Sequence, residues 1–354
     1  MFSVNLLIKP SSSLCNLKCE YCFYNDISQR RNNFSFGFMS EETIENVIKK
    51  AVAFSDRELT LSFQGGEPTL IGLDFYKKVI EIEKKYNTKN IIINNALQTN
   101  GVGIEESWAD FFNENNFLIG ISLDGIKETH NKNRSSFDKV MKTVGLFKSK
   151  NVQFNILTVV NNETANRAEE IYRFYRENGF DYIQFIPCIE PYEKENQFLD
   201  AEKYGKFLTE TFNLWYEDIN KGREVHIRQF ENYIEMLFGY PPESCGMSGI
   251  CSIQYVVEAD GGVYPCDFYV LDEYKLGNLN SDSFSDIDMK RRNIHFIENS
   301  YSLNIKCRDC RYFSLCRGGC MRYRTKTGMN VLCEGYEIFF DNCFEKIKEI
   351  AGKI

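Results

Sequence analysis

Apolar residues along positions 1–190 alternate between strand and helix spacing, and this alternation is what most constrains the fold. Amphipathic stretches separate short strand-like runs. One of them is Ser40–Lys50, where Ser40 is suited to cap a helix. Such alternation predicts a parallel sheet with helical crossovers, and six βα rounds predict an open barrel. We predict strands near residues 4–9, 58–64, 90–98, 117–123, 152–160 and 182–188.

Three cysteines, Cys15, Cys19 and Cys22, follow the first predicted strand with CxxxCxxC spacing. A 4Fe-4S cluster needs four ligands, so three thiolates from one short loop would leave one iron open for chemistry. A zinc site is the alternative. Structural zinc normally takes four ligands in CxxC-type pairs, and no nearby His or Cys completes such a local site. The pattern therefore favours a cluster with an open iron.

This spacing resembles that of the radical S-adenosylmethionine (SAM) superfamily, whose open iron chelates the amino and carboxylate groups of SAM. The resemblance implies an α/β fold, a partial (β/α)6 TIM-type barrel with its chemistry at the C-terminal ends of the strands. At the end of the second predicted strand, Gly65 and Gly66 would let the backbone approach a ligand, and Glu67 could accept from an ammonium group. These three residues resemble the superfamily's GGE motif, which binds the amino group of SAM; a simple turn is the alternative.

A second motif follows the fourth predicted strand. Ser122, His130 and Arg134 resemble the SLDG…H…R stretch of peptide-modifying members, in which the serine and the arginine approach the SAM ribose and carboxylate. The planar guanidinium of Arg134 fits carboxylate recognition. Ser122 could instead cap the strand end, and we expect His130 to be a solvated loop residue. Asn100 and Gln184 are further candidates for the mouth of the barrel.

Eight cysteines form an ordered set in the C-terminal part of the chain, and they would suffice for two fully ligated cubes. The set closely resembles the SPASM domain, whose characteristic glycine is matched by Gly261. A pair of zinc ribbons is the alternative. The resemblance implies one auxiliary 4Fe-4S cluster on Cys245, Cys251, Cys266 and Cys320 and another on Cys307, Cys310, Cys316 and Cys333. Cys188 and Cys343 fall outside the pattern, and we expect them to be buried thiols.

Length and these motifs together predict two domains. Residues 1–235 would form the radical SAM partial barrel with bridging helices. Residues 236–354 would form the SPASM domain, with two auxiliary clusters and a C-terminal helix.

Almost the whole chain looks like the anaerobic sulfatase-maturating enzymes, most clearly in residues 6–24, 63–70 and 263–271. That family oxidises a Cys or Ser in a Cys/Ser-x-Pro/Ala-x-Arg motif of a sulfatase to Cα-formylglycine. Three 4Fe-4S clusters and SAM as cosubstrate are implied. One departure is the short loop 133–137, where the family pattern has more residues, in a region that could touch substrate.

The resemblance also implies a mechanism. A 5′-deoxyadenosyl radical takes a hydrogen atom from Cβ of the target, Asp267 removes a proton, and an auxiliary cluster accepts an electron. Asp267 follows Cys266 directly and could instead cap a turn. Tyr24 and Gln64 resemble positions at the family's active site, where we expect Tyr24 to contact the cofactor and Gln64 the substrate; either could instead be a satisfied polar group.

Composition limits the partners. The net charge is -8 without a basic block, so we expect no nucleic acid, and no apolar run approaches membrane-spanning length. Thirteen cysteines without a secretory signal indicate metal binding in a reducing cytoplasm. The expected partners are an unfolded sulfatase, or a peptide derived from one, and a flavodoxin- or ferredoxin-type reductant.

Two other functions compete with this interpretation. A maturase that forms thioether crosslinks or epimerises residues in a ribosomally made peptide would share the architecture. Such enzymes often carry an N-terminal peptide-recognition domain, and the presence of only 14 residues before Cys15 disfavours this alternative. A non-catalytic iron-sulfur electron carrier, or a zinc-binding interaction protein, would need neither the GGE motif nor an open three-cysteine site.

Overall fold

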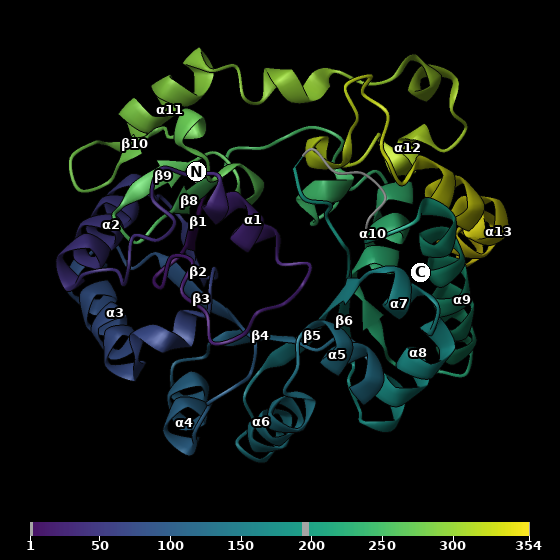
Figure 1. Cartoon of the computed structure of the whole chain (residues 1–354), viewed down its shortest axis with the longest axis horizontal. Helices are drawn as coiled ribbons and strands as arrows, with labels where there is room; N and C mark the ends of the chain where they lie inside the picture. Colours follow the sequence, from purple (N-terminus) through teal and green to yellow (C-terminus); the bar gives the residue numbers. More distant parts are fainter. Residues whose placement is uncertain (1–2, 193–197, 354) are drawn as a thin grey trace. The chain divides into compact units, whose positions relative to one another are not determined.

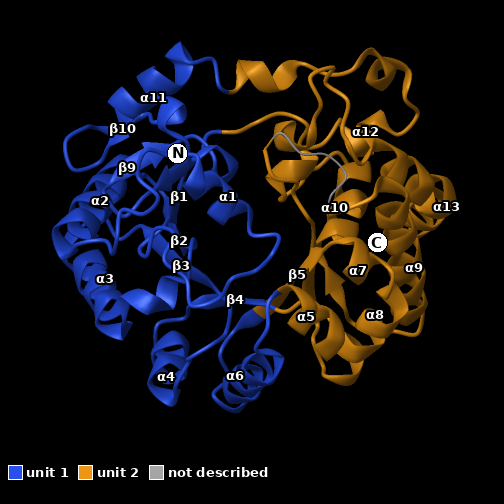
Figure 2. Cartoon of the chain, in the orientation of Figure 1, with its two compact units in different colours: residues 1–122, 134–154, 253–296 blue, residues 123–133, 155–252, 297–354 orange. Residues whose placement is uncertain are grey.

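The structure, a computed structural model, describes residues 3–192 and 198–353 (Figure 1). It divides into two compact units, each assembled from segments far apart in the sequence (Figure 2). Unit 1 comprises residues 1–122, 134–154 and 253–296, and unit 2 comprises residues 123–133, 155–252 and 297–354. The boundary predicted at residues 235/236 stays a prediction from the sequence.

All six predicted strands form, within two residues of their predicted ends. They are β1 (Ser3–Ile8), β2 (Glu58–Phe63), β3 (Ile92–Thr99), β4 (Leu118–Ser122), β5 (Phe154–Val160) and β6 (Tyr182–Pro187). Side chains along β1 and β2 alternate between buried and more exposed positions, as the period of two residues requires. The α/β class with a parallel sheet is therefore confirmed.

Unit 1 is built on the strand order β10-β9-β8-β1-β2-β3-β4. Strand β8 (Tyr255–Val257) runs parallel to β1, and β9 (Gly262–Tyr264) and β10 (Gly277–Asn278) continue the sheet in antiparallel pairs. The helices of this unit are α1 (Phe23–Gln29), α2 (Glu41–Phe54), α3 (Leu73–Tyr86), α4 (Glu106–Glu114), α6 (Phe137–Ser149) and α11 (Phe284–Asn293), with 3-10 turns η1 (Pro68–Ile71), η3 (Asp267–Tyr269) and η4 (Asp272–Tyr274).

Local sequence explains why these helices begin and pack as they do. Ser40 caps α2 as predicted, because its hydroxyl accepts a hydrogen bond from the Thr43 amide at 3.1 Å. The apolar residues of α2 recur at three- and four-residue spacing and are buried. Between the sheet and α3, the aromatic rings of Phe63, Tyr76 and Phe117 pack against one another.

Unit 2 contains the parallel strands β5, β6 and β7 (His226–Ile227). Its helices are α5 (Lys127–Asn133), α7 (Asn162–Ala165), α8 (Ala168–Glu177), α9 (Ala201–Asn220), α10 (Arg228–Leu237), α12 (Phe313–Cys316) and α13 (Cys333–Ala351), with 3-10 turns η2 (Cys245–Met247), η5 (Glu298–Tyr301), η6 (Ile305–Asp309) and η7 (Met321–Tyr323). Helices α9 and α13 lie side by side (Figure 1), and Phe212, Phe230 and Phe339 from α9, α10 and α13 form an aromatic core.

A buried acid in α3 makes the stability of the fold depend on pH. Glu83 is buried and accepts a hydrogen bond from Asn95 at 3.0 Å, and burial raises its pKa from 4.5 to about 7. The folded state therefore binds the proton more tightly than the unfolded state. The free energy of unfolding should fall as pH rises from about 4.5 to about 7.

Glu83→Gln should remove this pH dependence and stabilise the protein by about 1–3 kcal/mol at alkaline pH. The new amide could also donate to Asn95 Oδ1, which is buried without a hydrogen-bond partner. Anaerobic urea unfolding at about pH 5 and about pH 8 measures the effect. The exposed Glu81→Gln on the same helix is the control. Equal pH slopes for wild type and Glu83→Gln would contradict the prediction.

Candidate active site

Five neighbouring parallel strands of unit 1 end at the same edge of the sheet, and a polar side chain lies at or directly after each end. In parallel sheets this carboxyl edge is where ligands and catalytic groups gather. In sheet order these residues are Glu258 after β8, Lys9 after β1, Gln64 after β2, Asn100 after β3 and Ser122 at the end of β4.

The three N-terminal cysteines lie at this edge, in the loop between β1 and α1. Arg134 approaches them, with its Nη1 3.8 Å from the sulfur of Cys19. Burial raises the pKa of Cys22, and the positive charges of Arg134 and Lys9 act in the opposite direction. The two cations therefore partly offset the effect of burial on the Cys22 thiol.

The loop of Gly65 and Gly66 packs directly against the cysteine loop. Both glycines have positive φ, and a Cβ added to Gly66 would lie 2.2 Å from the carbonyl oxygen of Leu14, just before Cys15. The amide of Glu67 donates to that same carbonyl at 2.8 Å. Only glycine allows this conformation and this close approach. The two motifs therefore form one continuous binding surface at the ends of β1 and β2.

The carboxylate of Glu67 is buried and holds neighbouring strand ends together. Its Oε1 accepts hydrogen bonds from Thr69 and from the hydroxyl of Thr99 at 2.8 Å, and its Oε2 accepts from the amide of Asn100 at 2.8 Å. Burial raises the pKa of Glu67, and these hydrogen bonds lower it. Asn100 in turn donates to Asn16 beside Cys15, so the cysteine loop, the GGE loop and the end of β3 are linked.

Asp267 lies in turn η3, and its two carboxylate oxygens have separate partners from two strand ends. Its Oδ1 forms an ion pair with Lys9 Nζ at 2.5 Å, and its Oδ2 accepts a hydrogen bond from Gln64 Nε2 at 3.0 Å. Lys9 is fully buried, whereas the side chain of Asp267 is 16% exposed. A carboxylate fixed at both oxygens and still reachable is suited to accept a proton from a bound substrate.

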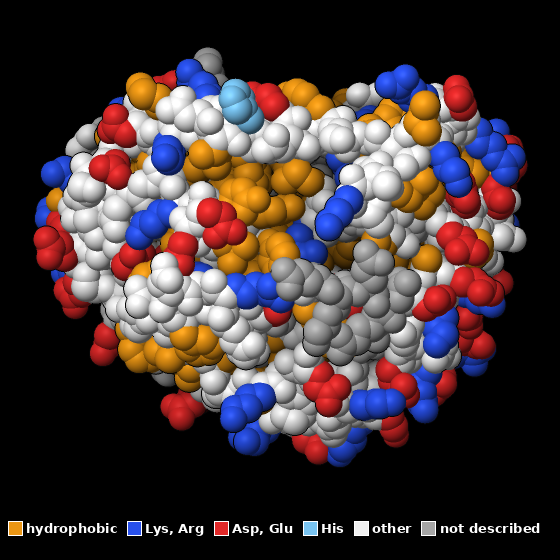
Figure 3. All heavy atoms as spheres, turned by 45° about the horizontal axis from the view of Figure 1, so that its top comes forward, with side chains coloured by type: hydrophobic (Ala, Val, Ile, Leu, Met, Phe, Trp, Pro, Cys, Tyr) orange, Lys and Arg blue, Asp and Glu red, His pale blue; other side chains and the backbone are white. Residues whose placement is uncertain are grey.

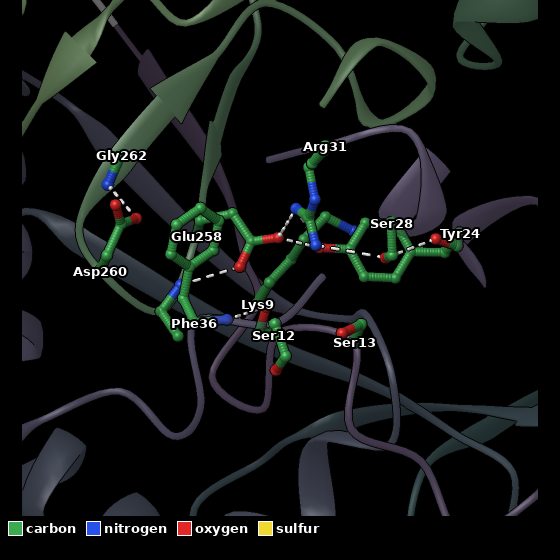
Figure 4. A network of polar contacts seen from close by, with 12 residues as sticks. Lys9, Ser12, Ser13, Tyr24, Ser28, Arg31, Phe36, Glu258, Asp260 and Gly262 are labelled. Atoms are coloured by element: carbon green, nitrogen blue, oxygen red, sulfur yellow. Dashed lines mark hydrogen bonds and ion pairs between the residues drawn. The ribbon is translucent and has the colours of Figure 1, made fainter. Parts of the chain in front are cut away.

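A buried network fixes Tyr24 beside Lys9 (Figure 4). The Tyr24 hydroxyl donates to Glu258, which also forms an ion pair with Arg31 at 2.6 Å, and both charged side chains are fully buried. The ammonium of Lys9 lies 3.8 Å from the centre of the Tyr24 ring. Two buried cations, Lys9 and Arg31, are thus each paired with an acid, Asp267 and Glu258, which keeps the charges compensated.

Sequence reasoning missed Lys9, Arg31 and Glu258. Lys9 and Glu258 directly follow apolar strand runs, and Lys9 also lies in the family-like stretch 6–24, whereas Arg31 carried no comparable signal. The expectation that His130 is a solvated loop residue was wrong, because its side chain is fully buried. Its Nδ1 accepts a hydrogen bond from the backbone amide of Asp124 at 3.2 Å, in the turn after β4. Gln184 accepts from Arg228 at 3.4 Å within unit 2.

Seven of the eight cysteines in the ordered C-terminal set lie in unit 2, where they form two groups. Burial raises the pKa of Cys320 to about 12, with Cys245 and Cys251 close enough to raise it further. Burial likewise raises the pKa of Cys316 to about 12, reinforced by three neighbouring cysteines: Cys333, Cys310 and Cys307. Cys266 belongs to unit 1. Cys188 and Cys343 are buried, as predicted.

The donor chemistry of these groups suits iron-sulfur clusters. All thirteen cysteines are free thiols. Among residues 3–192 and 198–353, no group of three or more His, Cys, Asp or Glu side chains is arranged to hold a single metal ion.

The described helices include none long and apolar enough to cross a membrane. On the face drawn in Figure 3, basic and acidic side chains are interspersed.

Comparison with known families defines the class. Residues 10–175 match the radical SAM superfamily, and residues 248–311 match the SPASM iron-sulfur cluster-binding domain. The fold and the cysteine loop described above are thus those of a radical SAM enzyme with a SPASM domain, as the sequence predicted.

Relatives narrow this class further. The chain is 44% identical to a cysteine-type anaerobic sulfatase-maturating enzyme of Clostridium novyi (strain NT), over 99% of this chain and 98% of the relative. It is 33% identical to a serine-type enzyme of Bacteroides thetaiotaomicron, over 95% and 88% of the two chains. The chain belongs to the anaerobic sulfatase-maturating enzymes.

A solved structure agrees with this assignment over the full length. It is described as "Native anSMEcpe with bound AdoMet and Cp18Cys peptide", has a TM-score of 0.94 and is 42% identical, with 99% of each chain covered.

Proposed function

We propose that this chain oxidises a cysteine, or a serine, in the Cys/Ser-x-Pro/Ala-x-Arg motif of a sulfatase to Cα-formylglycine. The observation that carries the proposal is the position of Asp267. It is fixed between Lys9 and Gln64 at the sheet edge that also carries the cysteine loop and the GGE loop. Membership of the sulfatase-maturating family supplies the substrate class.

The motifs at the sheet edge and the membership of the family also assign residues to the cofactors. Cys15, Cys19 and Cys22 would hold a 4Fe-4S cluster with an open iron, at which SAM binds. Gly65, Gly66, Glu67, Ser122, Arg134 and Tyr24 would surround SAM. When bound, this cluster and SAM would supply the 5′-deoxyadenosyl radical for removal of a hydrogen atom from Cβ, and an auxiliary cluster would supply an acceptor for the electron left on the substrate.

The auxiliary ligand sets follow the spacing and the grouping of thiols in unit 2. One complete set of four cluster ligands is supported by Cys307 and Cys310, whose thiols add to the effect of burial in raising the pKa values of Cys316 and Cys333. The grouping of Cys245, Cys251 and Cys320 supports three ligands of the other set. Cys266 is assigned as the fourth from the spacing alone.

The chain's own acid-base step falls to Asp267. After the hydrogen atom has left Cβ, the substrate must lose the proton of its thiol or hydroxyl and one electron to become a thioaldehyde or aldehyde. Asp267 accepts that proton, while Gln64 orients the carboxylate and Lys9 balances its charge. Water then converts a thioaldehyde to formylglycine with loss of hydrogen sulfide.

The partners follow from this chemistry. The substrate is an unfolded sulfatase or a peptide derived from one, and electrons come from a flavodoxin- or ferredoxin-type reductant. We place the enzyme in the cytoplasm, because thirteen free thiols persist best in a reducing compartment.

Mass spectrometry of motif peptides tests the function. The enzyme, reconstituted anaerobically with iron and sulfide, is incubated with SAM, dithionite and a peptide containing Cys-x-Pro-x-Arg. We expect the mass change of replacing CH2SH by CHO at that cysteine, and loss of two hydrogen atoms in the matched Ser peptide. A matched peptide with Ala in place of that cysteine should stay unchanged. Production of 5′-deoxyadenosine with unmodified Cys and Ser peptides would contradict the substrate assignment and favour a different peptide maturase.

A further inference from the structure

Arg324 lies just after turn η7 in unit 2, and its guanidinium is surrounded by backbone carbonyl groups. Nε donates to Gly318 at 3.1 Å, Nη1 donates to Ser300 at 2.6 Å and Ser302 at 3.2 Å, and Nη2 donates to Gly319 at 2.6 Å and also to Gly249. A half-buried arginine with five carbonyl acceptors has a fixed position, because the planar fork fills its hydrogen bonds in one orientation only.

The carbonyls that hold Arg324 come from the cysteine-bearing segments. Gly318 and Gly319 lie between Cys316 and Cys320 in the sequence, and Gly249 precedes Cys251 by two residues. Ser300 also receives a hydrogen bond from the Cys251 amide, at 2.8 Å to its hydroxyl. The guanidinium thus sits where the loops of the two thiol groups meet within unit 2.

The segments that hold Arg324 carry cysteines of both proposed ligand sets. Burial lowers the pKa of this arginine, and thiolates of four cysteines raise it. Two of these cysteines, Cys251 and Cys320, are assigned to one auxiliary cluster, and the other two, Cys307 and Cys316, to the other. Arginine stays protonated in proteins, so its charge is permanent. One fixed cation therefore acts on two anionic sites.

We propose that Arg324 raises the reduction potentials of both auxiliary clusters and so favours the transfer of the substrate electron to them. A 4Fe-4S cluster with four thiolate ligands is an anion and gains one more negative charge on reduction. A nearby fixed cation stabilises that reduced form. The inference rests on the proposed function, since it uses the ligand assignment given there. Arg324 is a positioning residue and touches no reacting atom.

Redox titration of the full-length reconstituted protein, followed by electron paramagnetic resonance, tests this inference. Wild type, Arg324→Gln and Arg324→Lys are compared, each also with Cys15, Cys19 and Cys22 replaced by Ala so that only auxiliary clusters contribute to the spectra. Arg311→Gln is the control, because it removes the same charge from an exposed position next to Cys310. Iron is quantified in every sample.

In Arg324→Gln, we expect the equilibrium constant for reducing each auxiliary cluster to fall about tenfold, which is about 59 mV for one electron. Arg324→Lys should keep most of the wild-type potential, and Arg311→Gln should keep all of it. Unchanged potentials in Arg324→Gln with full iron would overturn the inference and leave the proposed function intact.

Iron content separates the remaining outcomes. Loss of auxiliary iron from both Arg324 variants would show a purely structural role and overturn the inference. If the protein with intact Arg324 and with Cys15, Cys19 and Cys22 replaced bound iron for only one cluster, the ligand assignment would fail. The role of Arg324 would then fail with it.

Discussion

Asp267→Asn should lower formylglycine formation by about 10²–10⁴-fold, the usual effect of losing a general base, while 5′-deoxyadenosine still forms. Asparagine can keep a hydrogen bond with Gln64, but its amide cannot take the proton that the substrate must lose. Peptide mass spectrometry and deoxyadenosine quantification in the same reaction measure the two steps separately. Formylglycine at the wild-type rate would contradict the role of Asp267 as the base.

The main complication is Lys9, whose buried ammonium loses its counter-charge in this variant. Breaking a buried ion pair from one side costs about 3–5 kcal/mol, so the protein could become less stable as well as inactive. Asp267→Asn combined with Lys9→Met removes the pair as a unit and should recover much of the stability. Activity should stay low in the double variant. Asp272→Asn, which changes an exposed acid in the next turn, should behave like wild type.

The main sheet could be predicted because its signal is local. Each of β1 to β6 spans at least five residues with recurring apolar positions, long enough for periodicity to reveal it. Strands β7 to β10 span only two or three residues each and carry no such pattern. Strand β8 forms because Tyr255–Val257 pairs with β1, about 250 residues earlier in the chain. No window of sequence contains that pairing.

Part of the candidate site could likewise be predicted from the sequence, and part of it could not. Cysteine spacing and the GGE motif are local patterns whose chemistry is specific, so they could be found from residue types alone. The partners of Asp267 and Tyr24 could not, because an ion pair such as Arg31 with Glu258 joins positions 227 residues apart. Buried charges are recognisable in a sequence only after their partners are known. His130 was misjudged because its partner is a backbone amide, which leaves no pattern in the residue types.

Gly66→Ala should have the second large effect, by displacing the loop that carries Cys15. The new Cβ would lie 2.2 Å from Leu14 O and 2.8 Å from Ser12 O. Both contacts are with backbone atoms, so a side-chain rotation cannot relieve them. The loop must move by about 1 Å, and misplacement of that size can cost about 10²-fold in rate. We expect deoxyadenosine production to fall by about that factor, with part of the iron of the first cluster lost.

Gly37→Ala separates this steric effect from backbone strain. Gly37 also has positive φ, at 72° against 53° for Gly66, but a Cβ added there meets no atom within 4 Å. A left-handed alanine costs about 1–2 kcal/mol at either position. Gly37→Ala should therefore be slightly less stable and still cleave SAM at the wild-type rate. If both variants lost cleavage equally, strain alone would explain the effect. If neither did, the close approach of the GGE loop to the cysteine loop would not be what positions SAM.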